Sequence, residues 1–235
     1  MGGGGFSQEP ENLALDQYIL SQTAKARPKV CFVGTASGDS VDYIRRFYQA
    51  FRGLDCEPSH FAVYSGPIGD WRDYILSKDV IYVGGGNTRN MLALWREWNL
   101  DAVLREALEE GIVLAGVSAG SICWFEEGVT DSIPGSLTPM KCLGFLGGSN
   151  CPHYDGEPGR RPSYHELLQS KLIGSGLACD DGVALHYVDG NLRQIVSSRE
   201  NARAYRLTRE GSAVSEAVLV PTFLGAHPGA SGSVH

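Results

Sequence analysis

The sequence predicts an α/β protein with a mostly parallel sheet flanked by helices on both faces, followed by C-terminal β-hairpins. Two features of the 235-residue chain indicate this class. In the first half, near-continuous apolar runs alternate with amphipathic helical patterns, which is typical of parallel strands buried on both faces. In the second half, short β-rich runs are joined by turn residues, which is typical of hairpins.

The first half contains four predicted strands with helices between them. Asp39 or Ser40 can cap the first of these helices, and Gly111 can end the helix at 100–111. The apolar runs that predict strands are residues 29–34, 60–64, 79–85 and 112–118. The patterns that predict helices are residues 41–54, 87–100 and 100–111, followed by a helix that starts at Ala119.

The second half contains one predicted helix and two predicted hairpins. A polar stretch rich in Gly and Pro separates them from the first half. The first hairpin is expected to turn at Asp189-Gly190. The predicted elements are a helix at 163–176 and hairpins at 182–198 and 203–220.

The length of the chain fits one core, so we expect a single α/β domain over residues 1–222 and a flexible tail over 223–235. The opening stretch MGGGGFS is similar to the glycine turn that follows a first strand, although only Met1 precedes it. Either that strand is absent or the chain starts further upstream.

The composition argues against several classes of function. The formal charge of −7 argues against nucleic acid or an anionic membrane as a partner, because both require a basic face. No apolar run is long enough to span a bilayer, and no secretion signal opens the chain. The six cysteines form no C-x-x-C pair, so we expect free thiols in the cytoplasm. The sequence contains no H-E-x-x-H motif or Cys/His cluster, so we expect no metal, and we also expect no cofactor.

The stretch GVSAG (116–120) matches the G-x-S-x-G pattern of a nucleophile elbow. In that arrangement the serine occupies a strained turn between a strand and a helix, and the two glycines prevent clashes. A predicted strand precedes Ser118 and a predicted helix follows it, which is the context that the pattern requires. We therefore expect Ser118 to be a nucleophile.

A nucleophilic serine needs a base, and His153 is the best candidate among six histidines. It lies in NCPHYDG, a loop bounded by Pro and Gly, where functional residues tend to occur. The others are less suitable because they precede the elbow, lie in the tail, or fall within a predicted helix or hairpin: His60, His227, His235, His165 and His186.

Three aspartates could orient His153. Asp180 and Asp181 lie together just before a predicted strand, where they could also be turn formers, and local chemistry favours Asp181 only slightly. Asp131 is a further acid downstream of the elbow. The resulting order is Ser, His, acid, which differs from the Ser, acid, His order of α/β-hydrolases and argues against a lipase or esterase.

The glycine stretch VGGGNT (83–88) can direct backbone N–H groups at an anion. It matches neither the dinucleotide-binding nor the P-loop pattern. An oxyanion hole fits better, with one N–H group from this stretch and another from Ala119, the residue after the nucleophile.

These motifs, taken in order, resemble those of the S51 serine peptidases, which include aspartyl dipeptidase (peptidase E) and cyanophycinase. The resemblance covers about residues 1–220 and rests on GGGGF, VGGGNT, GVSAGS, CPHYD and DDG. It implies a flavodoxin-like fold similar to that of class I glutamine amidotransferases. It also implies hydrolysis of short peptides, including dipeptides with an N-terminal aspartate, without a cofactor; a related isoaspartyl peptidase and a catalytically silent binding protein are the alternatives.

The resemblance also assigns expected roles to residues. It implies Ser118 as nucleophile, His153 as base and Asp181 as orienting acid, although the family has a glutamate at the last position. The oxyanion donors are expected to be Gly86 and Ala119, with Asp131 as a supporting acid. The candidates for substrate contact are Arg160, Arg161 and Asn87. The assembly state, with a homodimer as one option, stays open.

Overall fold

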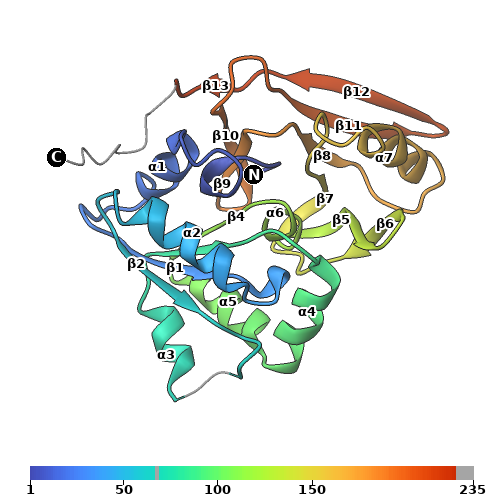
Figure 1. Ribbon diagram of the computed structural model, residues 1–235. Helices are drawn as coiled ribbons and strands as arrows, with labels where there is room; N and C mark the ends of the chain where they lie inside the picture. The colour runs from blue at the N-terminus through green and yellow to red at the C-terminus, as the bar shows by residue number, and fades with distance from the viewer. Residues whose placement is uncertain (67–68, 226–235) are drawn as a thin grey trace.

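The structure, a computed structural model, describes residues 1–66 and 69–225, and within them the strands form three sheets (Figure 1). The four-stranded sheet contains the strands predicted for the first half, in the order β2–β1–β3–β4, and all its neighbouring pairs are parallel. Its strands are β1 (Lys29–Val33), β2 (Glu57–Phe61), β3 (Val80–Val83) and β4 (Val113–Gly116).

Helices pack on both faces of this sheet, because alternate side chains of each strand point to opposite faces. In β1, Val30 and Phe32 pack with α1 and α2, whereas Cys31 and Val33 pack with α3, α4 and α5. These helices are α1 (Ala14–Leu20), α2 (Val41–Phe51), α3 (Trp71–Leu76), α4 (Thr88–Glu97) and α5 (Leu100–Glu109), and short 3-10 turns lie at Gly5–Ser7 and Thr35–Ser37.

A six-stranded sheet of order β12–β11–β8–β7–β5–β6 lies beside the first one (Figure 1). It is mixed: β7 is parallel to β5 and β8, and the remaining pairs are antiparallel. One core cluster joins it to α7 (Arg160–Gln169). Its strands are β5 (Phe125–Ile133), β6 (Ser136–Lys141), β7 (Leu146–Cys151), β8 (Gly176–Cys179), β11 (Ala204–Glu210) and β12 (Ala213–Leu219).

Both predicted hairpins are confirmed. The first turns at Asp189-Gly190 and belongs to a three-stranded sheet of order β13–β10–β9. The second is β11–β12, whose strands pair from Ala204 with Leu219 to Glu210 with Ala213. The strands of the small sheet are β9 (Val183–Val188), β10 (Asn191–Ser197) and β13 (Thr222–Phe223).

The structure differs from the sequence-based expectations in several places. The strand predicted at 60–64 is β2 at Glu57–Phe61, because the Val63 and Tyr64 N–H groups turn away to donate to Asp39 Oδ2 at 2.6 and 2.7 Å. Strands β5, β6 and β7 lie in a region for which no strand was predicted. The tail predicted from 223 begins inside β13, where Phe223 pairs with Ser197, and residues 226–235 lie outside the described residues.

Among the helices of residues 1–66 and 69–225, none combines the length and apolar character that a bilayer crossing requires.

Candidate functional site

Ser118 lies on a sharp turn between β4 and α6 (Ala119–Ile122), as the G-x-S-x-G pattern predicts. Its backbone has φ 57° and ψ −112°, a strained conformation for a residue with a side chain. The flanking glycines are required by packing: a Cβ on Gly116 would lie 2.1 Å from the Gly120 oxygen, and one on Gly120 would lie 2.3 Å from the Val83 oxygen. The glycines therefore allow the close contact of α6 with the sheet that positions Ser118.

His153 and Asp181 are in contact. His153 follows β7, is buried, and has its Nδ1 atom 2.6 Å from Asp181 Oδ1. The hydrogen bond from His153 lowers the pKa of the Asp181 carboxyl. A carboxylate that accepts from Nδ1–H favours the tautomer with Nε2 free to accept a proton, which is the arrangement that a general base needs.

The adjacent acid, Asp180, points elsewhere. Its Oδ2 atom accepts from the Arg203 N–H at 2.8 Å and from the Tyr205 hydroxyl at 3.4 Å. Burial raises its pKa to about 6. Of the two neighbouring aspartates, Asp181 is thus the one that contacts His153.

The opening glycine segment joins the parts of the site. The Ser118 N–H donates to the Met1 oxygen at 3.1 Å, and the His153 N–H donates to the Gly2 oxygen at 3.3 Å. A Cβ on Gly3 would lie 2.0 Å from Asp181 Oδ1. The glycine pattern predicted a turn for this segment but not its contacts with the site. The available signal was four consecutive glycines outside any flexible linker.

Ser118 Oγ makes no hydrogen bond to His153 in the described part of the chain, so the expected direct contact is absent in this conformation. Gly85 lies on one side of the serine: a Cβ there would be 3.3 Å from Ser118 Cβ and 3.8 Å from Oγ. Contacts between nucleophile and base are often longer without substrate and tighten in the reactive complex.

The two expected oxyanion donors have free N–H groups. The Gly85 N–H donates to the Tyr43 hydroxyl at 3.3 Å, and the Asn87 N–H donates to the Ala36 oxygen at 2.7 Å. Between them, the Gly86 N–H has no hydrogen-bond partner within residues 1–66 and 69–225, and neither has the N–H of Ala119. Gly86 has φ 137°, and a Cβ there would lie 2.2 Å from the Ala36 oxygen, so this position requires glycine.

The candidate substrate-contact residues are engaged within the protein. Arg160 is 2% exposed, with Nε 2.6 Å from Glu157 Oε2 and Nη2 3.6 Å from Asp131 Oδ1. Arg161 is paired with Glu216, and its side chain is 55% exposed.

Asn87 caps α4 by accepting from the Asn90 N–H at 2.9 Å, and its Nδ2 donates to the Ser132 oxygen at 3.0 Å. Asn87 is therefore the N-cap residue of α4 and lies directly after Gly86 in the chain.

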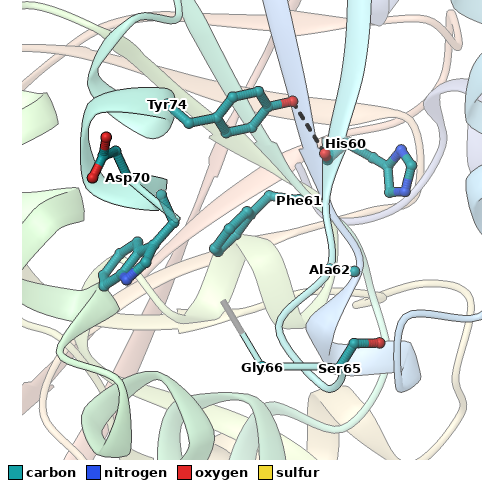
Figure 2. A pocket seen from close by; sticks show the side chains of 8 residues that line it. His60, Phe61, Ala62, Ser65, Gly66, Asp70 and Tyr74 are labelled. Atoms are coloured by element: carbon teal, nitrogen blue, oxygen red, sulfur yellow. Dashed lines mark hydrogen bonds between the residues drawn. The ribbon is translucent and has the colours of Figure 1, made fainter. Parts of the chain in front are cut away.

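A separate cavity of about 410 Å³ lies between β2 and α3 (Figure 2). His60 contributes to its lining, and the His60 oxygen accepts from the Tyr74 hydroxyl at 3.1 Å. Phe61 and Trp71 stack at its wall, with ring centroids 5.9 Å apart. None of its lining residues belongs to the Ser118–His153–Asp181 group. The described residues contain no cluster of three or more His, Cys, Asp or Glu side chains placed to hold a metal ion.

Comparisons with known proteins identify the family of this chain. The family model described as "Peptidase family S51" matches residues 1–195. The "Uncharacterized peptidase YgaJ" of Bacillus subtilis is 58% identical over 225 residues, which cover 96% of this chain and 97% of that protein. "Peptidase E" of Shewanella amazonensis is 32% identical over 141 residues, 58% of each chain.

A solved structure supports the fold. The crystal structure of a peptidase from an acI-B1 Actinobacterium aligns with a TM-score of 0.70 and 17% identity, covering 94% of this chain and 92% of that one. The family match extends over most of the chain, and the Bacillus relative matches nearly all of it. The chain therefore belongs to peptidase family S51 and is a serine-type peptidase.

Proposed function

We propose that this peptidase hydrolyses short peptides through an acyl-enzyme, with Ser118, His153 and Asp181 as its catalytic triad. The observation that carries the proposal is the 2.6 Å contact of His153 Nδ1 with Asp181 Oδ1, since it orients the base and favours the required tautomer. The strained turn at Ser118 supports the role of this residue as nucleophile.

In the proposed reaction, Ser118 Oγ attacks the scissile carbonyl carbon and transfers its proton to His153 Nε2. The N–H groups of Gly86 and Ala119 stabilise the negative oxygen of the tetrahedral intermediate. His153 then donates the proton to the leaving amine, and the peptide bond breaks. Water repeats the sequence on the acyl-enzyme and releases the acid, which regenerates Ser118.

The narrower proposal is a preference for dipeptides with an N-terminal aspartate. A substrate carboxylate would bind an arginine near the site, with Arg160 and Arg161 as the candidates. The Arg160 side chain is buried and already paired with Glu157, whereas the Arg161 side chain is half-exposed and therefore accessible to a substrate. A panel of Asp-X, Ala-X and Lys-X dipeptides, isoaspartyl peptides and longer peptides tests this preference. Equal kcat/KM for Asp-X and Ala-X would contradict it.

Six free cysteines, five of them buried, support the expected cytoplasmic location, because reduced thiols persist there.

The variant Ser118→Ala tests the nucleophile. We expect kcat to fall by at least about 10³-fold, since removal of a triad nucleophile leaves only the contribution of binding and the oxyanion hole. The melting temperature should change little, because Ser118 Oγ makes no hydrogen bond within the described chain. Covalent labelling of the native protein by a phosphonofluoridate should modify Ser118 and abolish activity. A Ser118→Ala protein with native peptidase activity would refute the proposal.

A further inference from the structure

His153 occupies a strained turn directly after β7. Its backbone has φ 53°, in the left-handed region that residues with side chains rarely adopt. Such a conformation persists only where the surrounding contacts fix it. Small displacements of a catalytic group slow a reaction strongly, so the contacts that fix this turn bear on the chemistry. The residues that anchor the turn are therefore candidates for positioning residues.

Backbone hydrogen bonds hold the turn toward the opening glycine segment and β8. The His153 N–H donates to the Gly2 oxygen at 3.3 Å, and the Glu157 N–H donates to the His153 oxygen at 3.1 Å. The Tyr154 N–H donates to the oxygen of Cys179, the last residue of β8, at 3.0 Å. None of these three bonds involves α7 or β12, so a side chain has to hold the turn in that direction.

The Tyr154 side chain anchors the turn toward α7 and β12. It is 4% exposed, and its ring centroid lies 5.0 Å from that of Tyr205 on β11 and 6.4 Å from that of Tyr164 on α7. Its hydroxyl donates to Glu216 Oε2 at 2.6 Å. Because Tyr154 follows His153 directly in the chain, the position of this ring constrains the turn that carries the base.

Glu216 lies on the inner face of the edge strand β12. It pairs with Leu207 of β11, which is fully buried, and directly opposite residues of an antiparallel pair point to the same face. Figure 1 shows α7 beside the β11–β12 hairpin, and Val214 of β12 packs in the same cluster as Leu207 and α7. The Glu216 side chain is 11% exposed. A charge in such a place is costly unless it is paired and hydrogen-bonded.

Three donors satisfy the Glu216 carboxylate. Its Oε2 atom accepts from the Tyr154 hydroxyl at 2.6 Å and from His165 Nε2 at 2.7 Å, and its Oε1 atom accepts from Arg161. Burial raises the pKa of this carboxyl, but the hydrogen bonds and the Arg161 charge outweigh burial and hold the pKa below its usual value. Glu216 is therefore ionised at neutral pH, and an ionised acceptor binds the Tyr154 hydroxyl more strongly than a neutral one.

We propose that Glu216 and Tyr154 are positioning residues for His153. The Glu216 carboxylate fixes the Tyr154 hydroxyl, and the Tyr154 ring in turn fixes the strained turn that brings His153 to Asp181. We call this pair the Tyr154–Glu216 brace. The inference rests on the proposed function of His153 as the general base. Neither residue of the brace transfers a proton; loss of the brace displaces the imidazole from Asp181 and lowers kcat.

Tyr154→Phe and Tyr164→Phe form a matched pair of variants. Both tyrosines are buried in the same core cluster. The Tyr154 hydroxyl lies 2.6 Å from Glu216 Oε2. The Tyr164 hydroxyl lies 2.6 Å from Ser149 Oγ. Each variant removes one buried hydroxyl and keeps the ring, so we expect similar decreases in melting temperature, but only Tyr154→Phe removes a contact of the His153 turn.

Initial-rate kinetics on a short peptide give the first readout. We expect kcat to fall at least about tenfold in Tyr154→Phe and in Glu216→Ala, with KM nearly unchanged, because a displaced base slows chemistry rather than binding. The double variant should be no slower than the slower single variant, because both substitutions break the same contact. Tyr164→Phe should keep the native kcat. Native kcat in Tyr154→Phe, or an equal loss in Tyr164→Phe, would overturn the proposal.

NMR of the proton on His153 Nδ1 gives a second readout, which does not depend on activity. The 2.6 Å hydrogen bond to Asp181 should place this signal at low field in the native protein. We expect the signal to move upfield or to broaden in Tyr154→Phe and Glu216→Ala, and to stay in place in Tyr164→Phe. An unchanged signal in the first two variants would overturn the proposal even with a reduced kcat. If the proposed triad chemistry fails, this comparison still tests the brace.

Discussion

The variant Asp181→Asn tests which acid supports His153. Asp181 Oδ1 accepts from His153 Nδ1 at 2.6 Å, and the charge on this carboxylate matters most when the imidazole becomes imidazolium during acyl transfer. Two unit charges about 4 Å apart in an effective dielectric of roughly 20 attract by about 4 kcal/mol. At 1.36 kcal/mol for each tenfold change, we expect kcat to fall roughly 10³-fold. KM should change little, because the lost interaction develops only in the transition state.

The assay is initial-rate kinetics on a short peptide, with thermal unfolding to check that the variant is folded. Asp180→Asn is the matched control, because Asp180 faces Arg203 and Tyr205, and an amide oxygen can still accept from the Arg203 N–H. This control should keep kcat within about tenfold of the native value. The assignment of Asp181 would be refuted by an Asp181→Asn protein with native kcat, or by an equal loss in Asp180→Asn.

Three further predictions concern the scaffold of the site. Gly120→Ala should lower both stability and kcat, because its Cβ would lie 2.3 Å from the Val83 oxygen. Chemical denaturation should show a free energy of unfolding lower by about 1–3 kcal/mol. Gly147→Ala is the control, because a Cβ there meets nothing within 4 Å. Arg160→Ala should lower the free energy of unfolding by about 2–3 kcal/mol, since it leaves the Val129 oxygen and Glu157 without their partner. Arg161→Ala should lower it by less than about 1 kcal/mol, because the Arg161 side chain is half-exposed and Glu216 keeps its contacts with Tyr154 and His165. Equal losses in urea titrations would contradict the burial argument. Burial lowers the pKa of the Met1 amine from 8.0 to about 6. Between pH 6 and 8 the unfolded chain therefore binds more protons than the folded chain does. The free energy of unfolding should rise by up to about 3 kcal/mol from pH 6 to pH 8. Nα-acetylated protein should lack that increment, and an identical pH dependence with and without acetylation would exclude the amine as its source.

Local sequence patterns determined most of the fold and the candidate residues. The apolar runs and turn glycines predicted the parallel strands and both hairpins, because burial on two faces and tight reversals restrict which residues can occur. The pattern G-x-S-x-G predicted the turn at Ser118 for a similar reason: backbone atoms approach both glycines closely. Family S51 followed from motifs that each occupy only a few residues.

The sequence could not predict the strands between Phe125 and Cys151, where apolar residues neither alternate regularly nor form continuous runs. It also missed the displacement of β2, because the Val63 and Tyr64 N–H groups are removed from the sheet by a distant carboxylate, Asp39. Interactions of this kind leave no local pattern in the chain.

For the site, the sequence determined the residue types, and only the tertiary structure decided their partners. Asp180 and Asp181 are chemically equivalent neighbours in the chain, and the difference arises from the backbone direction just before β9, which turns one carboxylate to His153 and the other to Arg203. The opening segment offers no side-chain chemistry to the site, yet the Met1 oxygen accepts from the Ser118 N–H, the Gly2 oxygen accepts from the His153 N–H, and Gly3 packs closely against Asp181. The contacts that distinguish the two aspartates join residues 23 and 28 positions apart, and those of the opening segment reach residues more than 100 positions away. Composition and spacing do not encode such contacts.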